Sequence, residues 1–349
     1  MYTREILPGR ASPIEDGIPL QGTWTRAFEE VDLLAVRRPY RYPLPRWMRD
    51  NRIKEWETFI IQDDRFYLEA IFGNLKMYGM AQVFLYDKDT REQFIFRKVI
   101  PGSGWRLPRS LYNTSVDSRS YGFFFRIHNW LDADTIKLDL DIEAARRRPA
   151  FTAHAEFDLN RTAAVPMAVS LSFAERRNLY AFKAFTAVRG DVVFGGRHLS
   201  FNPEKCSGIF HDYKGFYPYR TRMVWCNGMG FDGEGRRFGF NIVENQTRET
   251  HKNNENALWI NGELTPLPPV RITMPGGIES DWIIQDLEGM VDLVFTPREQ
   301  MRNGVNILVA HTEYETPLGY YNGTLVSAGG EQIQVRNLWG MGERLYLRV

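Results

Sequence analysis

Short runs of alternating apolar and polar residues, separated by turns, constrain this chain more than any other feature. Residues Ile136 to Ile142 alternate without a break, which is typical of a β-strand with one buried face and one solvated face. Similar runs lie at residues 57–62, 65–70, 81–86, 153–157 and 168–173. We expect single helical turns at residues 117–120 and 144–148, and no long helix. The pattern therefore predicts an all-β chain.

The turns are clearest in the second half of the chain, where dipeptides that contain glycine separate apolar runs. These dipeptides are Gly195-Gly196, Asn261-Gly262, Glu288-Gly289 and Gly329-Gly330. Asn-Gly is a strong hairpin signal because both of its residues adopt positive φ at little cost. The strands expected beside the last three turns are residues 257–260, 263–267, 282–285, 291–295, 324–326 and 332–335. Short antiparallel strands at this spacing predict barrels or sandwiches.

The amino-acid composition limits the kinds of molecule that the chain is expected to bind. Its 44 basic and 43 acidic residues give a net charge of +1, which argues against a disordered chain and against nucleic-acid binding by bulk charge. Aromatic residues make up 14% of the 349 residues, and they favour strands and the walls of apolar pockets. We therefore expect an apolar small-molecule ligand and no nucleic acid, while the sequence leaves the oligomeric state open.

Compartment signals are few. No stretch reaches the roughly 18 apolar residues of a transmembrane helix, and the first residues lack the apolar core of a signal peptide. The two cysteines, Cys206 and Cys226, cannot build a disulfide framework. We expect a cytoplasmic protein without stable membrane insertion, for which peripheral contact with a membrane stays open.

The first 50 residues contain six prolines, which exclude a long helix or an inner strand there. We expect an irregular segment packed on the rest of the molecule. Residues 37–54 interleave six arginines and Lys54 with two tyrosines and Trp47. Two interpretations stay open for this stretch: an arm that binds phosphate or lipid headgroups, or a solvated lip packed by its own aromatic residues.

The densest polar constellation begins at His211, Asp212 and Tyr213 and continues through Tyr219 and Arg220. An aspartate beside aromatic residues and an arginine can have a shifted pKa. Such a carboxyl group is able to protonate an alkene or deprotonate a water molecule. Alternatively, Asp212 and Arg220 form a buried ion pair that fixes a barrel corner.

A second group of candidates follows. On a strand, Asn241 lies on one face, and Glu244 shares the other with apolar residues, so it becomes an internal carboxylate if that face is buried. Glu255 is a second candidate acid. The alternative interpretation is that Glu255 and Asn256 bond to backbone groups of a loop. Trp225 and Trp282 are further candidates for the pocket wall.

The sequence contains no motif that is typical of a cofactor or metal site. No histidine pair has metal-ligand spacing on a helix, and there is no Cys-x-x-Cys. The Gly228-Met229-Gly230 stretch lacks the spacing and helix of a dinucleotide fingerprint. Phosphate-binding P-loops and Gly-x-Ser-x-Gly elbows are missing. We therefore expect neither cofactor nor metal.

An ordered set of motifs resembles the family called domain of unknown function 2804. In the second half these motifs are Asp212-x-x-x-Gly215, Pro218-Tyr219-Arg220-Thr221, Trp225, Gly239-x-Asn241, Glu255-Asn256-Ala257, Gly262-x-Leu264, Trp282, Gly289-x-Val291-Asp292-Leu293-x-Phe295-x-Pro297, Gly319-x-Tyr321-x-Gly323 and Gly340-x-Gly342-Glu343. In the first half they are Gly22-x-Trp24-x-Arg26, Lys54-x-Trp56-Glu57 and Tyr180-x-Phe182-Lys183. The chain departs from the family pattern Asp-Trp-x-Arg-Gly at Tyr213 and Lys214, which puts in doubt any role there for an indole or a guanidinium.

The resemblance implies a fold. The family is distantly similar to the carotenoid 1,2-hydratase, survival-factor and lipocalin-type Diels–Alderase group, which is built from two lipocalin-like β-barrels in tandem. We accordingly expect two antiparallel, calycin-type barrels or strongly curved sheets. Their predicted ranges are residues 51–185 and 186–349, after the irregular segment 1–50. Members of the wider group bind isoprenoid or lipid-like molecules, and some catalyse hydration or cyclisation, although fold alone does not fix function.

Three functions follow as hypotheses. The first is a cofactor-free hydration, dehydration or cyclisation of an isoprenoid- or lipid-like molecule, in a pocket within or between the barrels. Asp212 or Glu255 would be the acid or base, and Trp225 and Tyr219 would shape the pocket. The second is a lipid carrier without catalysis. The third is a sugar-active hydrolase or lyase with paired carboxylates across an open groove. The residues expected to bind substrate are His211, Tyr213, Tyr219, Arg220, Trp225, Asn241, Glu244, Asn256 and Trp282.

Overall fold

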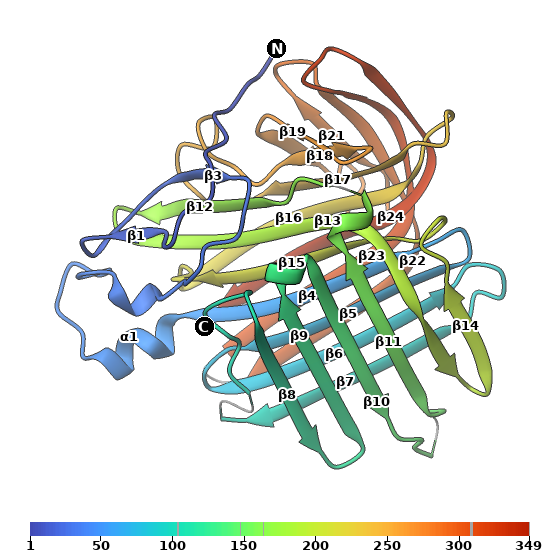
Figure 1. Ribbon diagram of the computed structural model, residues 1–349, viewed down its shortest axis with the longest axis horizontal. Coiled ribbons are helices and arrows are strands. Elements are labelled where there is room, and N and C mark those ends of the chain that lie inside the picture. The colour runs from blue at the N-terminus through green and yellow to red at the C-terminus, as the bar shows by residue number, and fades with distance from the viewer. Residues whose placement is uncertain (103–104, 147, 163, 308–309, 349) are drawn as a thin grey trace.

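The computed structural model describes residues 1–102, 105–146, 148–162, 164–307 and 310–348, and for residues 301–307 and 310–312 it describes only backbone. Two large antiparallel sheets account for most of the chain, and each is curled into a half-barrel (Figure 1). The prediction of an all-β chain made of two strongly curved antiparallel sheets is confirmed. Among the described residues, no helix is long and apolar enough to cross a membrane.

The first sheet contains most of the strands up to residue 215. In spatial order its main strands are β7 (Gln93–Pro101), β6 (Tyr78–Asp87), β5 (Phe66–Asn74), β4 (Lys54–Gln62), β15 (Ser207–Gly215), β13 (Arg177–Phe194), β11 (Phe151–Asp158), β10 (Thr135–Ile142), β9 (Phe123–Trp130) and β8 (Thr114–Ser120). Two further strands, β12 (Met167–Ala174) and β14 (Arg197–Phe201), pair with β13, and β3 (Gly22–Trp24) pairs with β12.

The second sheet begins at Arg220. In spatial order its strands are β19 (Glu263–Pro266), β18 (Ala257–Ile260), β17 (Arg237–Glu244), β16 (Arg220–Phe231), β24 (Gln332–Arg348), β23 (Ala310–Val326), β22 (Val291–Ile307), β21 (Trp282–Asp286) and β20 (Val270–Thr273). At the end of β17, the Glu244 carboxylate accepts a hydrogen bond of 2.8 Å from the backbone N–H of Ile272 in β20. This bond ties together two strands that are distant in the order of the sheet.

The remaining elements are short. They are β1 (Ile14–Glu15), β2 (Ile18–Pro19), η1 (Leu33–Ala35), α1 (Arg46–Arg52), η2 (Leu131–Ala133) and α2 (Leu159–Thr162). The first two strands pair only with each other. The first 50 residues are thus mostly irregular, as the prolines predict, although β3 adds a short strand to the first sheet.

The sheets divide the chain later than the predicted boundary after residue 185, which falls inside β13. After β14 the chain returns as β15 to the middle of the first sheet, where it pairs with both β13 and β4. The crossing from one sheet to the other lies between Gly215 and Arg220. Sequence spacing did not indicate this return because the partners of β15 are distant in the sequence.

The local predictions have different outcomes. The expected hairpin turns at residues 195–196, 261–262, 288–289 and 329–330 are confirmed, and each connects two paired strands. The helical turn expected at residues 117–120 is wrong, because these residues belong to β8 and pair with β9. The second expected helical turn is also wrong, since Ala145 and Arg148 form a β-bridge.

The last three long strands were predicted only in part. Each of β22, β23 and β24 has 17 residues, whereas the apolar runs indicated only their ends. Internal glycine and proline residues accompany irregularities and close approaches within these continuous strands. A Cβ atom at Gly319 would lie 2.1 Å from the carbonyl oxygen of Thr296 on the neighbouring strand, so only glycine fits.

Three apolar cores follow from the two curved sheets. One fills the first half-barrel, one fills the second, and a third lies between the sheets. Along β4, Phe59 and Ile61 belong to the first core, while Ile60 between them belongs to the core between the sheets. Central strands of the first sheet are thus buried on both faces. In contrast, β10 buries only Ile136 and its alternate neighbours, as its sequence predicts.

Candidate active site

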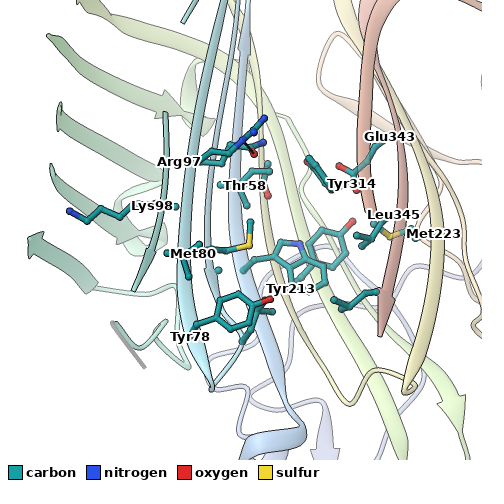
Figure 2. A pocket seen from close by; sticks show the side chains of 18 of the residues that line it. Thr58, Tyr78, Met80, Arg97, Lys98, Tyr213, Met223, Tyr314, Glu343 and Leu345 are labelled. Carbon is teal, nitrogen blue, oxygen red and sulfur yellow. Dashed lines mark hydrogen bonds between the residues drawn. The ribbon is translucent and has the colours of Figure 1, made fainter. Parts of the chain in front are cut away.

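A cavity of about 180 Å³ lies between the two sheets, and residues of both sheets form its walls. Strands β4 to β7 contribute one wall, and β16, β23 and β24 contribute the opposite one (Figure 2). Much of the lining is apolar and includes Trp56, Ile71, Met80, Met223, Trp225 and Leu345. The cavity reaches the surface near Val99, which lines it and is 56% exposed. Such a cavity fits an apolar small molecule.

Strand register places one carboxyl group on this wall. Glu343 in β24 lies directly opposite Trp225 in β16, and the neighbouring pair on the same face is Met223 and Leu345. Directly opposed residues of paired strands share a face of the sheet. Glu343 therefore shares the cavity face of the second sheet with these apolar residues, and it lines the cavity although it is only 3% exposed.

The environment of Glu343 changes its protonation. Burial raises the pKa of its carboxyl group to about 7, and an interaction with the Tyr314 hydroxyl opposes that rise. In Figure 2 the two side chains lie side by side at one wall of the cavity. An acid that titrates near neutral pH is able both to donate and to accept a proton under physiological conditions.

A second buried carboxyl group belongs to the same region. Glu69 in β5 lies opposite Ile60 and Phe84, and both of these belong to the core between the sheets. Burial and the negative charge of Glu343 raise the pKa of Glu69 to about 8. No cation among the described residues contributes to the shift of either acid. We refer to Glu69 and Glu343 as the carboxyl pair, in which loss of one proton disfavours loss of the second.

Aromatic residues form another part of the wall. Tyr213 and Trp225, both predicted to bind substrate, line the cavity, and Tyr213 lies 5.3 Å from Trp56 between ring centres. The indole N–H of Trp225 donates to Oδ1 of Asn241 at 2.7 Å. Asn241 therefore fixes the orientation of Trp225 from behind the wall. The predicted grouping of these three residues in one region is found in the structure.

Glu255 lies in a buried polar network next to this aromatic wall. Its carboxylate accepts hydrogen bonds from Tyr213 at 2.7 Å and from the Asn245 side chain at 2.9 Å, and it forms an ion pair of 2.9 Å with Lys183. Lys183 also contacts Nδ1 of His211 at 3.2 Å. These contacts occupy both carboxylate oxygens of Glu255.

Burial sets the protonation states in this network. Burial, together with the Lys183 ammonium, holds the pKa of His211 well below its ordinary value, so His211 is neutral. Burial and the negative charge of Glu255 raise the pKa of Tyr213 well above its usual range. Tyr213 therefore keeps its proton and reaches the cavity as a neutral hydroxyl group supported by Lys183 and Glu255.

Asp212 lies on the opposite face of the first sheet from the cavity. It points to the inside of the first half-barrel and lies opposite Glu57 on β4. Both of its carboxylate oxygens pair with the Lys214 ammonium. The alternative prediction of an Asp212–Arg220 ion pair is wrong because Lys214 takes that place, and Arg220 begins β16 in an exposed position.

Four other candidate residues lie outside the cavity. Glu244 binds the Arg271 side chain and the backbone of β20, so it links strands. Asn256 accepts from the backbone of Val243 and donates to Pro268, as the loop-capping interpretation predicts. Trp282 is fully buried in the second half-barrel, and Tyr219 is 56% exposed at the surface.

Sequence reasoning did not single out the carboxyl pair or Lys183 as functional residues. Glu343 ends the Gly340-x-Gly342-Glu343 motif, whose glycines allow a close approach to Trp282 and to β16. That motif was the available signal. Glu69 lies in an apolar run, and the only feature of the sequence that indicates a function there is the presence of an acid among apolar residues. No group of three or more histidine, cysteine or acidic residues in the described chain is placed to hold a metal ion.

Comparison with known proteins gives a family for this chain. A family described as Domain of unknown function (DUF2804) matches residues 15–348. The chain belongs to that family. This member of the DUF2804 family matches no curated protein.

Comparison with solved structures finds likeness at low sequence identity. Kievitone hydratase from Nectria haematococca is 13% identical, with a TM-score of 0.52 over 84% of this chain and 88% of that one. The protein CghA is 12% identical, with a TM-score of 0.49 and the same coverage of 84% and 88%. The likeness to kievitone hydratase shows that the DUF2804 chain shares its fold.

Proposed function

We propose that this protein binds an apolar, isoprenoid- or lipid-like small molecule in the cavity between the sheets. There it carries out hydration, dehydration or cyclisation by proton transfer. The observation that carries the proposal is a buried carboxyl group, Glu343, whose pKa lies near 7 and which faces a largely apolar cavity. The name of a protein with the same fold, kievitone hydratase, supports hydration as the type of reaction.

In the hydration direction, protonated Glu343 gives its proton to one carbon of a carbon–carbon double bond. Positive charge develops on the other carbon, where the oxygen of a water molecule forms the new bond. The Glu343 carboxylate then takes the proton that this water releases, so one water is added and the acid is restored. Dehydration is the reverse. In a cyclisation a second double bond of the substrate replaces water as the nucleophile, and the cation that this leaves loses a proton to the Glu343 carboxylate, which forms a new double bond and restores the acid.

The surrounding side chains support this chemistry. Trp56, Trp225 and Tyr213 line the cavity, and contact of a developing cation with the face of an aromatic ring stabilises the cation by about 1–2 kcal/mol. Glu69 retains its own proton at neutral pH and therefore adds no negative charge beside Glu343. The apolar lining supports this function over a sugar-active enzyme, which needs an open polar groove.

The first test asks whether a ligand is present. Native mass spectrometry of the purified protein, followed by organic extraction, identifies what binds, and a panel of terpenoids and prenylated phenols is then assayed for turnover. Glu343→Gln is expected to lower turnover by at least about 100-fold while binding is retained. Activity is expected to decline as the pH rises through about 7, because the first step needs the protonated acid.

Asp212→Asn is the matched comparison, since it removes a buried acid that lies on the other face of the sheet. If Asp212→Asn abolishes turnover in a stably folded protein while Glu343→Gln does not, the acid is Asp212 and this assignment fails. A bound apolar ligand that no variant or condition converts would instead identify a lipid carrier.

A further inference from the structure

An exposed, strongly basic segment lies beside the opening of the cavity. Residues 37–52, here termed the arginine segment, contain six arginines and a single acidic residue, Asp50. Asp50 forms an ion pair with Lys76 at 3.2 Å, so it leaves the arginines unneutralised. Two more arginines approach from the turn before β13 and from its first residue: Arg176 donates to the backbone of Arg37, and the Arg177 guanidinium lies 5.4 Å from the Tyr40 ring.

Apolar groups project from the same segment. Trp47 is 67% exposed, Tyr42 is 59% exposed and Met48 is 37% exposed. The only helix in the segment, α1, buries none of its residues. Helices as short as α1 are marginal in water unless packing stabilises them. Exposed aromatic and methionine side chains surrounded by arginines form a surface that is incomplete without a partner.

The segment is attached to the cavity opening by a buried lysine. The Lys54 ammonium donates to the carbonyl of Asn51 at the end of α1 at 2.8 Å and to the carbonyl of Leu75 at 2.9 Å. Leu75 lines the cavity at the turn between β5 and β6, where the neighbouring Met77 is 57% exposed. Figure 1 shows α1 leading directly into β4, which forms part of the cavity wall.

We propose that the arginine segment docks on a bilayer surface containing anionic lipids and thereby brings the opening of the cavity to the membrane. The arginines bind the headgroups, and Trp47 and Met48 enter the boundary between headgroups and acyl chains. An apolar molecule then passes between the bilayer and the cavity without crossing water. The docking goes beyond the proposed reaction, and it is testable in protein that turns nothing over.

Charge and shape favour a bilayer over a nucleic acid. The net charge of the whole chain is only +1, so the arginine segment, with six arginines and one acidic residue, is far more basic than the chain as a whole. The cavity at the edge of that surface is largely apolar, so it fits a molecule that comes from a bilayer and does not fit a nucleic acid. Exposed Met48 also suits acyl chains, because it has no planar face on which a base stacks.

The experiment is co-sedimentation of the full chain with vesicles of phosphatidylcholine alone and of phosphatidylcholine mixed with phosphatidylglycerol. We expect binding only to the mixed vesicles, and weaker binding as salt rises. Each arginine near an anionic surface contributes roughly fivefold in affinity, so the double variant Arg41→Ala/Arg46→Ala should bind roughly 25-fold more weakly. Brominated lipids should quench part of the tryptophan fluorescence, and Trp47→Phe should remove that quenched part.

The hairpin of β8 and β9 supplies matched controls. Tyr121 at its tip is 96% exposed, and Arg119 and Arg126 are exposed on its strands. Tyr121→Ala and Arg119→Ala/Arg126→Ala should leave vesicle binding unchanged, as should Glu343→Gln. That last result separates the docking from the proposed reaction.

Other outcomes overturn the docking. It fails if mixed vesicles do not bind the protein, or if the control variants weaken binding as much as those in the arginine segment. Binding of the segment to a short RNA, with no binding to vesicles, would assign the surface to nucleic acid instead.

Discussion

Asp212, inside the first half-barrel, and the carboxyl pair, between the two sheets, differ in how their charge is balanced. On the inner face, Asp212 is bonded through both oxygens to Lys214. On the cavity face, no cation contributes to the pKa of Glu69 or Glu343 among the described residues. Burial raises the pKa of Asp212, and the Lys214 ammonium opposes that rise and favours the charged form. A buried acid without such a partner changes its protonation near neutral pH, and only this second kind is suited to proton transfer.

The inner face itself is not uniform. Next to Asp212, burial and the Asp212 charge raise the pKa of Glu57 to about 8. The side-chain amide of Asn129 donates to Glu57 at 3.1 Å. Glu57 is therefore a buried neutral acid with no place on the cavity wall. Both Glu343 and Glu57 have a raised pKa, so the pKa alone does not identify the proposed catalytic acid. Glu343 is proposed because it lines the cavity and Glu57 does not.

The largest change in stability is expected from a substitution that breaks the Asp212–Lys214 ion pair on the inner face. Lys214→Met should lower the free energy of unfolding by about 3–5 kcal/mol, because it leaves Asp212 buried without its cation. Urea denaturation measures this change. The exposed Lys205 offers a control, and Lys205→Met should cost no more than about 0.5 kcal/mol. Equal costs for the two variants would mean that the Asp212–Lys214 pair contributes nothing.

The second effect is a pH dependence on the cavity face. The pKa of Glu69 is raised in the folded state to about 8, so the folded protein binds a proton more tightly than the unfolded chain. The resulting stabilisation is present at low pH and is lost as the pH rises through about 8. Relative to Glu69→Gln, the wild type should lose about 3 kcal/mol of unfolding free energy between pH 5 and pH 8.

Parallel unfolding curves for wild type and Glu69→Gln across that range would contradict the raised pKa of Glu69. The comparison with the variant is needed because other groups oppose the trend. His211 is held neutral in the folded state, so it makes the protein less stable as the pH falls below its ordinary pKa.

A smaller effect concerns the network behind the aromatic wall. Tyr213→Phe removes the hydroxyl that donates to Glu255 at 2.7 Å and accepts from Lys183 at 2.5 Å. We expect a loss of about 1–2 kcal/mol in the free energy of unfolding, since the direct Lys183–Glu255 pair remains. Thermal denaturation near neutral pH detects a change of this size. A loss as large as that of Lys214→Met would show that Tyr213 is required to hold the ion pair together.

The smallest effect is expected at the proposed acid itself. Glu343→Gln replaces a carboxyl group that is about half protonated at pH 7 with a neutral amide of the same shape. The free energy of unfolding should change by less than about 1 kcal/mol. Loss of activity in this variant then reflects chemistry and not unfolding. A loss of several kcal/mol would place Glu343 among the structural acids, beside Asp212.

Local patterns predict the strands well because strand formation and tight turns depend on neighbouring residues. Ile136 to Ile142 has one solvated face, and its alternation identifies both the strand and its buried side. Asn261-Gly262 fixes the hairpin of β18 and β19 for the same local reason. The return of β15 to the first sheet depends on partners far away in the sequence, and no local pattern encodes it.

The site is harder to predict because its strands are buried on both faces. Asp212 and Tyr213 are adjacent, yet Tyr213 lines the cavity and Asp212 points to the other side of the sheet. When both faces are apolar, alternation does not reveal which residue faces the second sheet. That Trp225 and Asn241 bind substrate stays a prediction, although Trp225 lines the cavity and Asn241 bonds to it. The carboxyl pair becomes visible only once the two sheets are packed together.

The construction of the cavity from two separate sheets has a consequence for how such proteins diversify. Most of the residues between the sheets meet through side chains, as Ile60, Tyr213 and Met341 do. A substitution on this face reshapes the cavity and leaves the backbone ladder of each sheet intact. Natural selection is thus able to change the accepted molecule by exchanging a few facing side chains. The same frame would then serve many ligands across distantly related organisms.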